Sequence, residues 1–306
     1  MFIMLREAEN YVKVEGILSE IDLNYGSYQR AGKTIDMIAG SIKVRVDQKI
    51  DGEIVQLEVP IHMFAGKYTN DGRPNPAYES IEKIMKNFTS IAAAGGEEGA
   101  DLIRVNSGKI RMNEYYTPDG RFISFPRIHA SFVTKVKRQE FKPEASFSMS
   151  FVVADKQFEL DKEGVETGRY QVKGIVPQYG GKVDIIDFIA SSESVINAVD
   201  QYWEKGDTVR CVGRLNFSST NETITKEVDF GEPQEIVRTI SVSDLIITGG
   251  SSTPLEGDFA YDMDEINEAI AARKAALEEQ KERDMNRGKR RNAPGKDTSK
   301  LDSLGF

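Results

Sequence analysis

Basic and aromatic side chains alternate with apolar ones along a predicted strand near residue 110. One face of that strand carries Lys109, Arg111, Asn113 and Tyr115. Its other face is apolar, with Ile110 and Met112, because successive strand residues point to opposite sides. The same alternation places Lys43 and Arg45 together on an earlier strand. Cations beside aromatic rings are the groups that hold single-stranded nucleic acids, with phosphates against the cations and bases stacked on the rings.

Three loops add further basic and aromatic residues to the same half of the chain. These candidates are Tyr25, Tyr28, Arg30 and Lys33 in the first loop, Lys67, Tyr68 and Arg73 in the next, and Tyr115, Tyr116 and Arg121 around a turn. Alternating Lys and Arg are also typical of a solvated strand, and tyrosines that flank a turn often pack on their own barrel. The first loop contains few apolar residues with which its tyrosines could form a core, and this favours a role in nucleic-acid binding. We expect Phe122, Phe125 and Phe132 in the core, and His129 stays unassigned between core and surface.

Residues that could carry catalysis are scarce. The histidines are His62 and His129 and the one cysteine is Cys211, so neither a Cys/His metal site nor a Cys-His nucleophile is indicated. Residues 26–34 resemble a phosphate-binding loop, but five residues separate the glycines where that motif has four, and no helix is predicted to follow. We expect a mobile loop at 26–34, a core thiol at Cys211, and a protein that is not an enzyme and uses no metal or cofactor.

The elements that must position these residues follow one order twice. The first set comprises strands at 11–23, 38–47 and 53–62, a helix at 78–91, and strands at 101–116 and 121–137. The second comprises strands at 146–153, 168–177 and 182–190, a helix at 192–204, and strands at 207–217 and 236–247. Three strands, a helix and two strands are the order of the OB-fold, a five-stranded Greek-key barrel. The predicted fold class is mainly β, with two tandem OB-fold barrels followed by a helix and a disordered tail.

Two patterns bear on this repeat. Gly-Lys-Ile-Arg-Met-Asn at 108–113 returns as Gly-Arg-Leu-Asn-Phe-Ser at 213–218, about one small domain later. Residues 172–176 resemble residues 14–18, so the strand at 168–177 fits either the first or the second position of its barrel. Trp203, at the end of the second predicted helix, is expected to plug the bottom of that barrel.

We predict three regions in the chain. Residues 1–138 form the main nucleic-acid-binding barrel, 139–248 a second OB-fold-like barrel, and 249–306 a linker, a helix and a flexible tail. The helix is predicted over 262–286, with a thin apolar stripe of Met263, Ile266, Ile270 and Leu277. Beyond Gly288 the chain is too basic and breaker-rich to stay ordered. It ends in an apolar tip that we expect to bind partner proteins, formed by Leu301, Leu304 and Phe306.

The net charge of −9 over 306 residues is unevenly distributed. Residues 1–138 carry +1, residues 139–248 carry −8 and residues 249–306 carry −2. Because phosphate binding is driven by cations, the first barrel is the one suited to a polyanion. No apolar run approaches the ~20 residues that cross a bilayer, and the start is charged too soon for a secretory signal. We therefore expect a cytoplasmic protein with no membrane partner, in a bacterial host cell if the chain is phage-encoded.

The chain resembles the single-stranded DNA-binding proteins of bacteriophages and bacteria. The similarity lies in the strand order, in Gly-Lys-Ile-Arg-Met-Asn-Glu-Tyr at 108–115 with Asp119-Gly120 after it, and in a tail that ends in phenylalanine. It covers most of 10–137, more loosely 146–248, and the last six residues. In that family the tail tip is acidic and ends in Pro-Phe, whereas this chain has Gly305 and, nearby, only Asp297 and Asp302.

This resemblance implies binding of single-stranded DNA without strong sequence preference, with RNA also open, in DNA replication, recombination and repair. It further implies that the tail recruits replication or recombination proteins. Two alternatives remain: a structural or virion-assembly protein whose barrels are packing modules, and an enzyme such as a nuclease. Strand binding that weakens steeply with salt would exclude the packing module. Loss of substrate in the presence of a divalent metal would reveal the nuclease.

Overall fold

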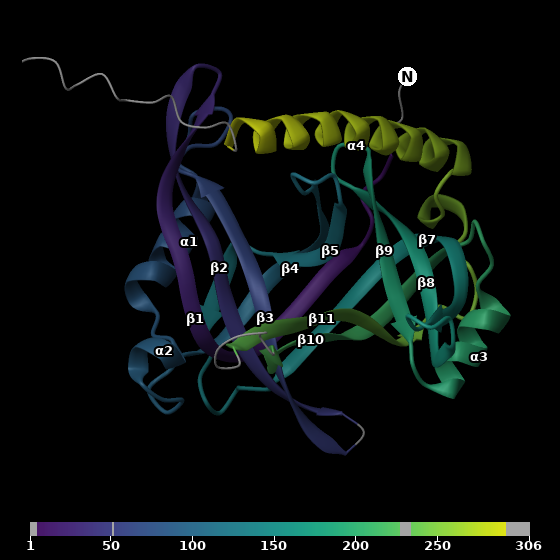
Figure 1. The fold of residues 1–306 in the computed structure, drawn as a ribbon, viewed down its shortest axis with the longest axis horizontal. Coiled ribbons are helices and arrows are strands. Elements are labelled where there is room, and N and C mark those ends of the chain that lie inside the picture. The colour runs from purple at the N-terminus through teal and green to yellow at the C-terminus, as the bar shows by residue number, and fades with distance from the viewer. Residues whose placement is uncertain (1–4, 51, 227–233, 292–306) are drawn as a thin grey trace, which may run out of the picture.

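The computed structural model describes residues 5–50, 52–226 and 234–291 and shows a mainly β protein (Figure 1). The first barrel contains β1 (Asn10–Arg30), β2 (Lys33–Ile50), β3 (Glu53–Gly66), α1 (Pro76–Asn87), α2 (Ile91–Ala94), β4 (Leu102–Tyr116), β5 (Phe122–His129) and β6 (Phe132–Lys135). β1 pairs with β2 and β4, β2 with β3, and β4 with β5, all antiparallel, while β3 runs parallel to β5. These pairings close the strands into the barrel of an OB-fold.

The second barrel repeats this topology. It contains β7 (Glu144–Leu160), β8 (Glu166–Gln178), β9 (Lys182–Ala190), α3 (Glu193–Tyr202), β10 (Thr208–Lys226) and β11 (Gln234–Gly250). β8 lies between β7 and β9, which settles it as the second strand of its barrel. β7 closes against β10, and β9 runs parallel to β11. The prediction of two tandem OB-fold barrels is confirmed.

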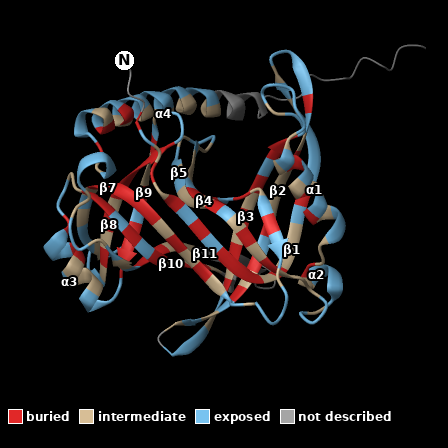
Figure 2. Ribbon diagram, turned by 180° about the vertical axis from the view of Figure 1, so that it is seen from behind, coloured by how far each residue is buried: buried red, intermediate tan, exposed pale blue. Residues whose placement is uncertain are grey.

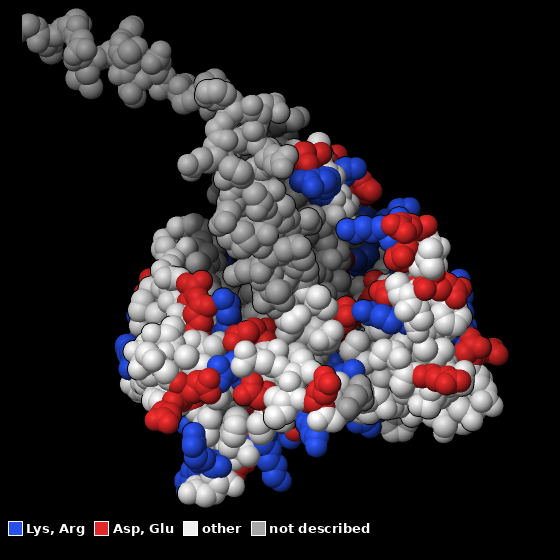
Figure 3. All heavy atoms as spheres, turned by 60° about the horizontal axis from the view of Figure 1, so that its bottom comes forward, with Lys and Arg blue, Asp and Glu red and all other residues white. Residues whose placement is uncertain are grey.

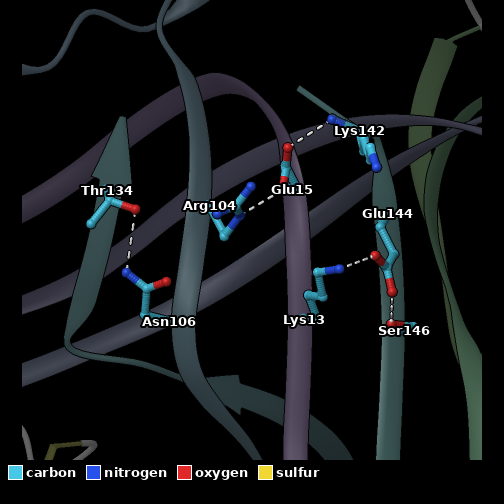
Figure 4. A network of polar contacts seen from close by, with 8 residues as sticks. All are labelled: Lys13, Glu15, Arg104, Asn106, Thr134, Lys142, Glu144 and Ser146. Carbon is cyan, nitrogen blue, oxygen red and sulfur yellow. Dashed lines mark hydrogen bonds and ion pairs between the residues drawn. The ribbon is translucent and has the colours of Figure 1, made fainter. Parts of the chain in front are cut away.

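The two barrels share one sheet because β1 also pairs with β7. Residues 10–15 lie antiparallel to residues 144–149. At this junction the carboxylate of Glu15, which is 1% exposed, accepts hydrogen bonds from Arg104 Nε at 2.6 Å and from the Lys142 backbone N–H at 2.7 Å (Figure 4). Burial raises the pKa of Glu15, but the hydrogen bonds from Arg104 and Lys142 outweigh it and hold the pKa below its usual value. The connection between the barrels is therefore fastened to the first one.

Alternating apolar residues build the core of each barrel, as the burial pattern along the strands shows (Figure 2). Gly16 allows β1 to cross β2 closely, because a Cβ there would lie 2.3 Å from the Arg45 carbonyl oxygen. In the second barrel the ring of Phe151 meets the ring of Trp203 edge-on, with centroids 5.8 Å apart. Trp203 and Cys211 are both buried, which confirms their expected places in the core.

A long C-terminal helix, α4 (Met263–Arg291), follows a short turn, η1 (Gly257–Phe259), and runs across one end of both barrels (Figure 1). Its apolar stripe is confirmed in part. Ile266 is buried and Ile270 and Leu277 are half-buried, whereas Met263 is exposed. The predicted disordered tail and its tip, Leu301, Leu304 and Phe306, lie outside the described residues. No helix within the described ranges is long and apolar enough to span a membrane.

Beyond Gly108, β4 no longer pairs with β1, so one edge of residues 109–116 has no neighbouring strand among the described residues. Side chains bond the backbone groups along this edge. Asn10 of β1 makes two hydrogen bonds with the backbone of Ile110, at 2.7 Å to its carbonyl and 2.9 Å from its N–H. One step along, the carboxylate of Asp184 in β9 accepts from the Met112 N–H at 3.2 Å. These side chains take the place of a neighbouring strand.

Helix α4 caps the rest of this edge. Gln280 donates to the Glu114 carbonyl at 2.6 Å, and the carboxylate of Asp284 accepts from the Tyr116 N–H at 3.2 Å. Arg273 adds an ion pair with Glu114 in which the side chains are only 18% and 13% exposed. The helix is thus bonded to the first barrel through the backbone of β4.

The predicted mobile loop at 26–34 is wrong, because strands occupy most of it. β1 and β2 continue outward as a hairpin that closes at Ala31 and Gly32, whose φ angles are 49° and 75°. Positive φ at both central residues is typical of a two-residue hairpin turn whose twist matches that of the strands. The extension escaped prediction because its strands have no core beneath them, so their residues show no apolar alternation.

The bounds of several elements also differ from expectation, and two of these differences change the element itself. The predicted helix at 78–91 begins two residues earlier, because Asn75 caps it by accepting from the Ala77 N–H at 3.1 Å, and it ends at Asn87. A separate turn of helix, α2, follows Ser90. The predicted strand at 121–137 is divided into β5 and β6.

Candidate nucleic-acid interface

An aromatic pair, the half-buried Tyr28 and the exposed Phe64, lies where the β1–β2 hairpin meets the end of β3. The rings of Tyr28 and Phe64 are tilted by 53° with centroids 5.8 Å apart, and Phe64 is 55% exposed. Gly66 makes room for the tyrosine, because a Cβ there would lie 2.6 Å from the Tyr28 hydroxyl oxygen. Phe64 alternates with the buried residues Met63 and Ala65, so it faces outward.

The loop after β3 is attached to this hairpin. Arg30 donates hydrogen bonds to Asn70 Oδ1 at 2.8 Å and to the Thr69 carbonyl at 2.9 Å. Lys67, at the start of the loop, forms an ion pair with Asp36 of β2 at 3.4 Å. The structure therefore brings together the first two predicted loop clusters, which also contain the exposed residues Tyr68, Arg73 and Lys33.

Tyr25 belongs to the same hairpin but points elsewhere. Tyr28 lies three positions further along the strand, an odd number, so the two side chains leave opposite faces of β1. The Tyr25 hydroxyl donates to Glu82 of α1 at 3.2 Å, although the ring remains 55% exposed. Tyr25 is thus available to solvent without joining the aromatic pair.

Most of the predicted cations already have a carboxylate partner. The ion pairs are Lys43–Glu20 and Arg45–Glu97 at 2.5 Å, Arg121–Asp119 at 2.6 Å, Lys109–Glu7 at 2.7 Å, and Arg73–Asp71. Of the two cations expected on one face of β2, Lys43 is 49% exposed, whereas the Arg45 side chain is only 12% exposed against Glu97. Among the described residues, Arg111 and Lys33 have no ionic partner within 4 Å.

Sequence reasoning missed a row of side chains that crosses β3 and β5. His62 and His129 are paired in register, and their rings have centroids 5.9 Å apart. Beside them the Arg127 guanidinium lies over the ring of Phe125, with its central carbon 5.1 Å from the centroid. The sequence of β3 contained a signal for this row, because His62 and Phe64 alternate with the core residues Ile61 and Met63 and must therefore face outward.

Both histidines have a lowered pKa. Burial brings the pKa of His62 to about 4, and the positive charges of Arg127 and His129 add to this effect. Burial also lowers the pKa of His129, together with Arg111 and Arg127. Both imidazoles are therefore neutral at pH 7. The contribution of the arginines shows that this face is locally positive, despite the net charge of the chain.

The aromatic residues near the β4–β5 turn do not lie where we expected. Phe122 and Phe132 are 44% and 45% exposed and Phe125 is half-buried, so the prediction that all three are in the core is wrong. Phe122 instead packs on Tyr116 with ring centroids 5.1 Å apart, and Lys281 of α4 lies 5.7 Å from the Tyr116 centroid. The β4–β5 hairpin extends beyond the barrel. Tyr116 and Phe122 at its end therefore contact each other and α4 instead of a core. Tyr115 remains exposed.

The described surface carries no broad patch of one sign in the view of Figure 3. There, Lys and Arg side chains are interspersed with Asp and Glu. Local groupings such as the one around Arg127 therefore matter more than the total charge. Within the described ranges, no three His, Cys, Asp or Glu side chains are grouped so as to hold a metal ion.

Comparison with known proteins identifies a family. The model of the family described as YorF matches residues 8–283. In structure the chain is similar to the wild-type single-stranded DNA binding protein from Thermus aquaticus, with a TM-score of 0.47, 14% identity, and coverage of 82% of this chain and 96% of that one. A deletion mutant of the same protein gives a TM-score of 0.46, 13% identity, and coverage of 82% and 97%. No curated protein matches the sequence.

Proposed function

We propose that this chain, which belongs to the YorF family, binds single-stranded DNA through the outer face of its first barrel. The observation that carries the proposal is the Tyr28–Phe64 pair beside Arg30, in which Phe64 is exposed and Tyr28 half-buried. Aromatic platforms of this kind stack nucleobases for ~1–3 kcal/mol each, and they accept any base because every base has a π-face. The expected binding is therefore indifferent to sequence.

The position of this pair in the barrel supports the proposal. OB-folds bind oligonucleotides across the second and third strands and the loops that follow the first and fourth. Tyr28 lies beside the turn after β1, and Phe64 lies on β3. The row of Arg127, His62 and His129 continues from β3 onto β5, which extends the face over several nucleotides.

The existing ion pairs do not prevent phosphate binding. Exposed pairs such as Arg121–Asp119, with side chains 76% and 57% exposed, contribute only ~0–1 kcal/mol. A phosphate can therefore replace the carboxylate at small cost. Arg111 and Lys33 are free of such competition among the described residues.

Anisotropy titration of the full chain tests the proposal. Labelled oligo-dT should bind far more tightly than duplex DNA of the same length, and its affinity should fall steeply as salt is added. An equivalent RNA in the same titration measures the preference between the two nucleic acids. Absence of oligo-dT binding at low salt would overturn the proposal.

The aromatic pair is tested separately. Tyr28→Ala should weaken oligo-dT binding by ~1–3 kcal/mol. The matched control is Phe158→Ala, which removes a ring that is 41% exposed near the end of β7 in the second barrel. If both variants bound oligo-dT equally well, Tyr28 would have no role in binding.

A second candidate function is that of a packing module in a larger assembly. The number of cations already paired with carboxylates favours it, because such a surface has little net charge to offer. The same titration distinguishes it, since a packing module has no affinity for strands at any salt concentration.

We also propose a role in replication or recombination, with recruitment of partner proteins by the tail. The support is the sequence of the last six residues, where Leu301, Leu304 and Phe306 are apolar side chains in a polar segment. Deletion of 298–306 should leave DNA affinity nearly unchanged and abolish capture of at least one replication or recombination protein. Capture of the same proteins by both chains would contradict this role.

A further inference from the structure

The two barrels form a groove between them that the predicted binding residues do not include. It has a volume of about 540 Å³. The first barrel contributes Pro60 and His62 from β3 and Phe125 and Arg127 from β5, and the second contributes Phe217 from β10 and Ser243 from β11. β10 also lies directly against β3, so the groove is part of the contact between the barrels.

The chemistry of the groove suits a nucleobase. Its walls contain flat apolar groups, the rings of Phe125 and Phe217 and Pro60, and none of its described lining residues is Asp or Glu. Arg127 lies over Phe125, and its buried Nε has no hydrogen-bond partner among the described residues. A buried donor without a partner is unfavourable, so this site gains by accepting a ligand with hydrogen-bond acceptors.

The surroundings of the groove set the direction of a bound strand. At one end it adjoins a second hollow that shares Ser124, Pro126 and Ser243 but is also lined by Glu159, Asp187 and Asp244. At that end Glu159 and Asp244 already hold Arg169, and Asp187 lies opposite Lys173 in the pairing of β8 with β9, so these cations are less available to phosphates. In the other direction, Arg127 lies opposite Arg111 and His129 lies opposite Lys109 in the pairing of β4 with β5. A polyanion is therefore favoured on the β5–β4 side.

We propose that this groove binds a base of single-stranded DNA, with Phe125 as the stacking ring, Arg127 as the hydrogen-bond donor and the second barrel as the opposite wall. The inference rests on the proposed function and deepens it, because it makes the second barrel part of the binding site. His62, neutral at pH 7, offers a ring nitrogen to a base edge rather than a charge to a phosphate. The strand then continues over Arg111 on the outer face of the first barrel.

Adding a carboxylate to the wall contributed by the second barrel tests the inference in the full chain. Ser243→Asp should weaken the binding of oligo-dT about tenfold or more, because a negative charge then faces the strand. The matched control is Ser194→Asp, an exposed serine of α3 in the same barrel but outside the groove. Circular dichroism and thermal melting of both variants establish that they fold.

Phe125→Leu tests the base contact itself. It should weaken binding of oligo-dT about fivefold or more and leave binding of an abasic strand of the same length unchanged, because only the stacked base is lost. If wild type, Ser243→Asp and Phe125→Leu bound oligo-dT equally well, the groove would not be a binding site, and the proposed function would still stand. A wild-type chain that binds no strand would overturn both.

Discussion

The two barrels share a topology but not a surface. In the first, Arg127 has a ring beneath it and no carboxylate partner among the described residues. In the second, Arg169 is held by Glu159 at 3.1 Å and by Asp244 at 2.9 Å. Lys173 likewise lies opposite Asp187 in the pairing of β8 with β9. Arg169 is therefore neutralised within the second barrel, whereas Arg127 and Arg111 have no such partner among the described residues.

This difference shows that topology and ligand are encoded by different residues. Buried alternation and closely packed glycines specify the barrel twice, in residues such as Gly16 and Gly174. The alternate, outward positions are free to differ because they do not affect closure. The second barrel then serves as one wall of a site rather than as a second copy of it.

The largest expected effect compares the two crossing glycines. Gly16→Ala should destabilise the chain by about 3 kcal/mol, because the new methyl group would meet a backbone oxygen at 2.3 Å. Gly174→Ala should cost about 1 kcal/mol, because its Cβ would meet ring atoms of Phe151 at 2.6 Å, and a side chain moves more easily than a strand. Urea unfolding of both variants measures the difference. Equal losses would show that the two crossings are equally rigid.

The next effect is the pH dependence contributed by the histidines, both of which lie in the first barrel. The folded pKa of His62 is about 4, below its ordinary value of 6.5, so the unfolded chain binds more protons between these values. Stability is therefore complete above pH 6.5 and lost as the pH falls toward 4, by about 2 kcal/mol once solvent screening is allowed for.

His62→Gln isolates this contribution. The variant should lose less stability than wild type between pH 6.5 and 4.5, as measured by thermal melting across that range. Carboxylates such as Glu15 have folded pKa values below their usual range, so they reduce stability mainly at lower pH. An unchanged pH profile in the variant would show that His62 is not the group that titrates.

The smallest effect concerns single cations in the two barrels. Arg111→Gln should reduce the slope of log affinity for oligo-dT against log salt by about 0.7, the value for one phosphate contact on a single strand. Arg169→Gln, the matched change in the second barrel, should leave the slope unchanged because its charge is already neutralised by Glu159 and Asp244. A reduced slope for Arg169→Gln would mean that both barrels contact phosphates.

The sequence predicted the parts of this structure that depend on alternation over a core. The strand at 182–190 and the buried place of Cys211 were recovered in this way, whereas Trp203 was predicted from its place at the end of a helix. The hairpin ending at Ala31 and Gly32 was missed because exposed strand residues have no apolar partner positions to reveal them. No local pattern distinguishes a phenylalanine such as Phe122, which packs on a neighbouring ring outside the core, from one that is buried.

Partners of side chains were the least predictable part of the candidate site. Arg45 was expected to be open, but Glu97, more than fifty residues later, covers it. Arg127 was overlooked because the groove that it lines is formed by two barrels. Phe64 was overlooked because its ring partner, Tyr28, belongs to the hairpin that was missed. Contacts between segments that are far apart in the sequence cannot be predicted from the spacing of residues within either segment.

The side chains that cap β4 have a consequence for how the molecule behaves in a crowded solution. An exposed strand edge is a template for another chain, and such edges are sites of aggregation. Gln280 and Asp284 occupy the backbone groups of Glu114 and Tyr116 that a foreign strand would seek. A chain cut before α4 keeps both barrels but presents this edge to its neighbours. The helix therefore protects the chain from aggregation at this edge. It does so with the side chains of Gln280 and Asp284 instead of with a further strand.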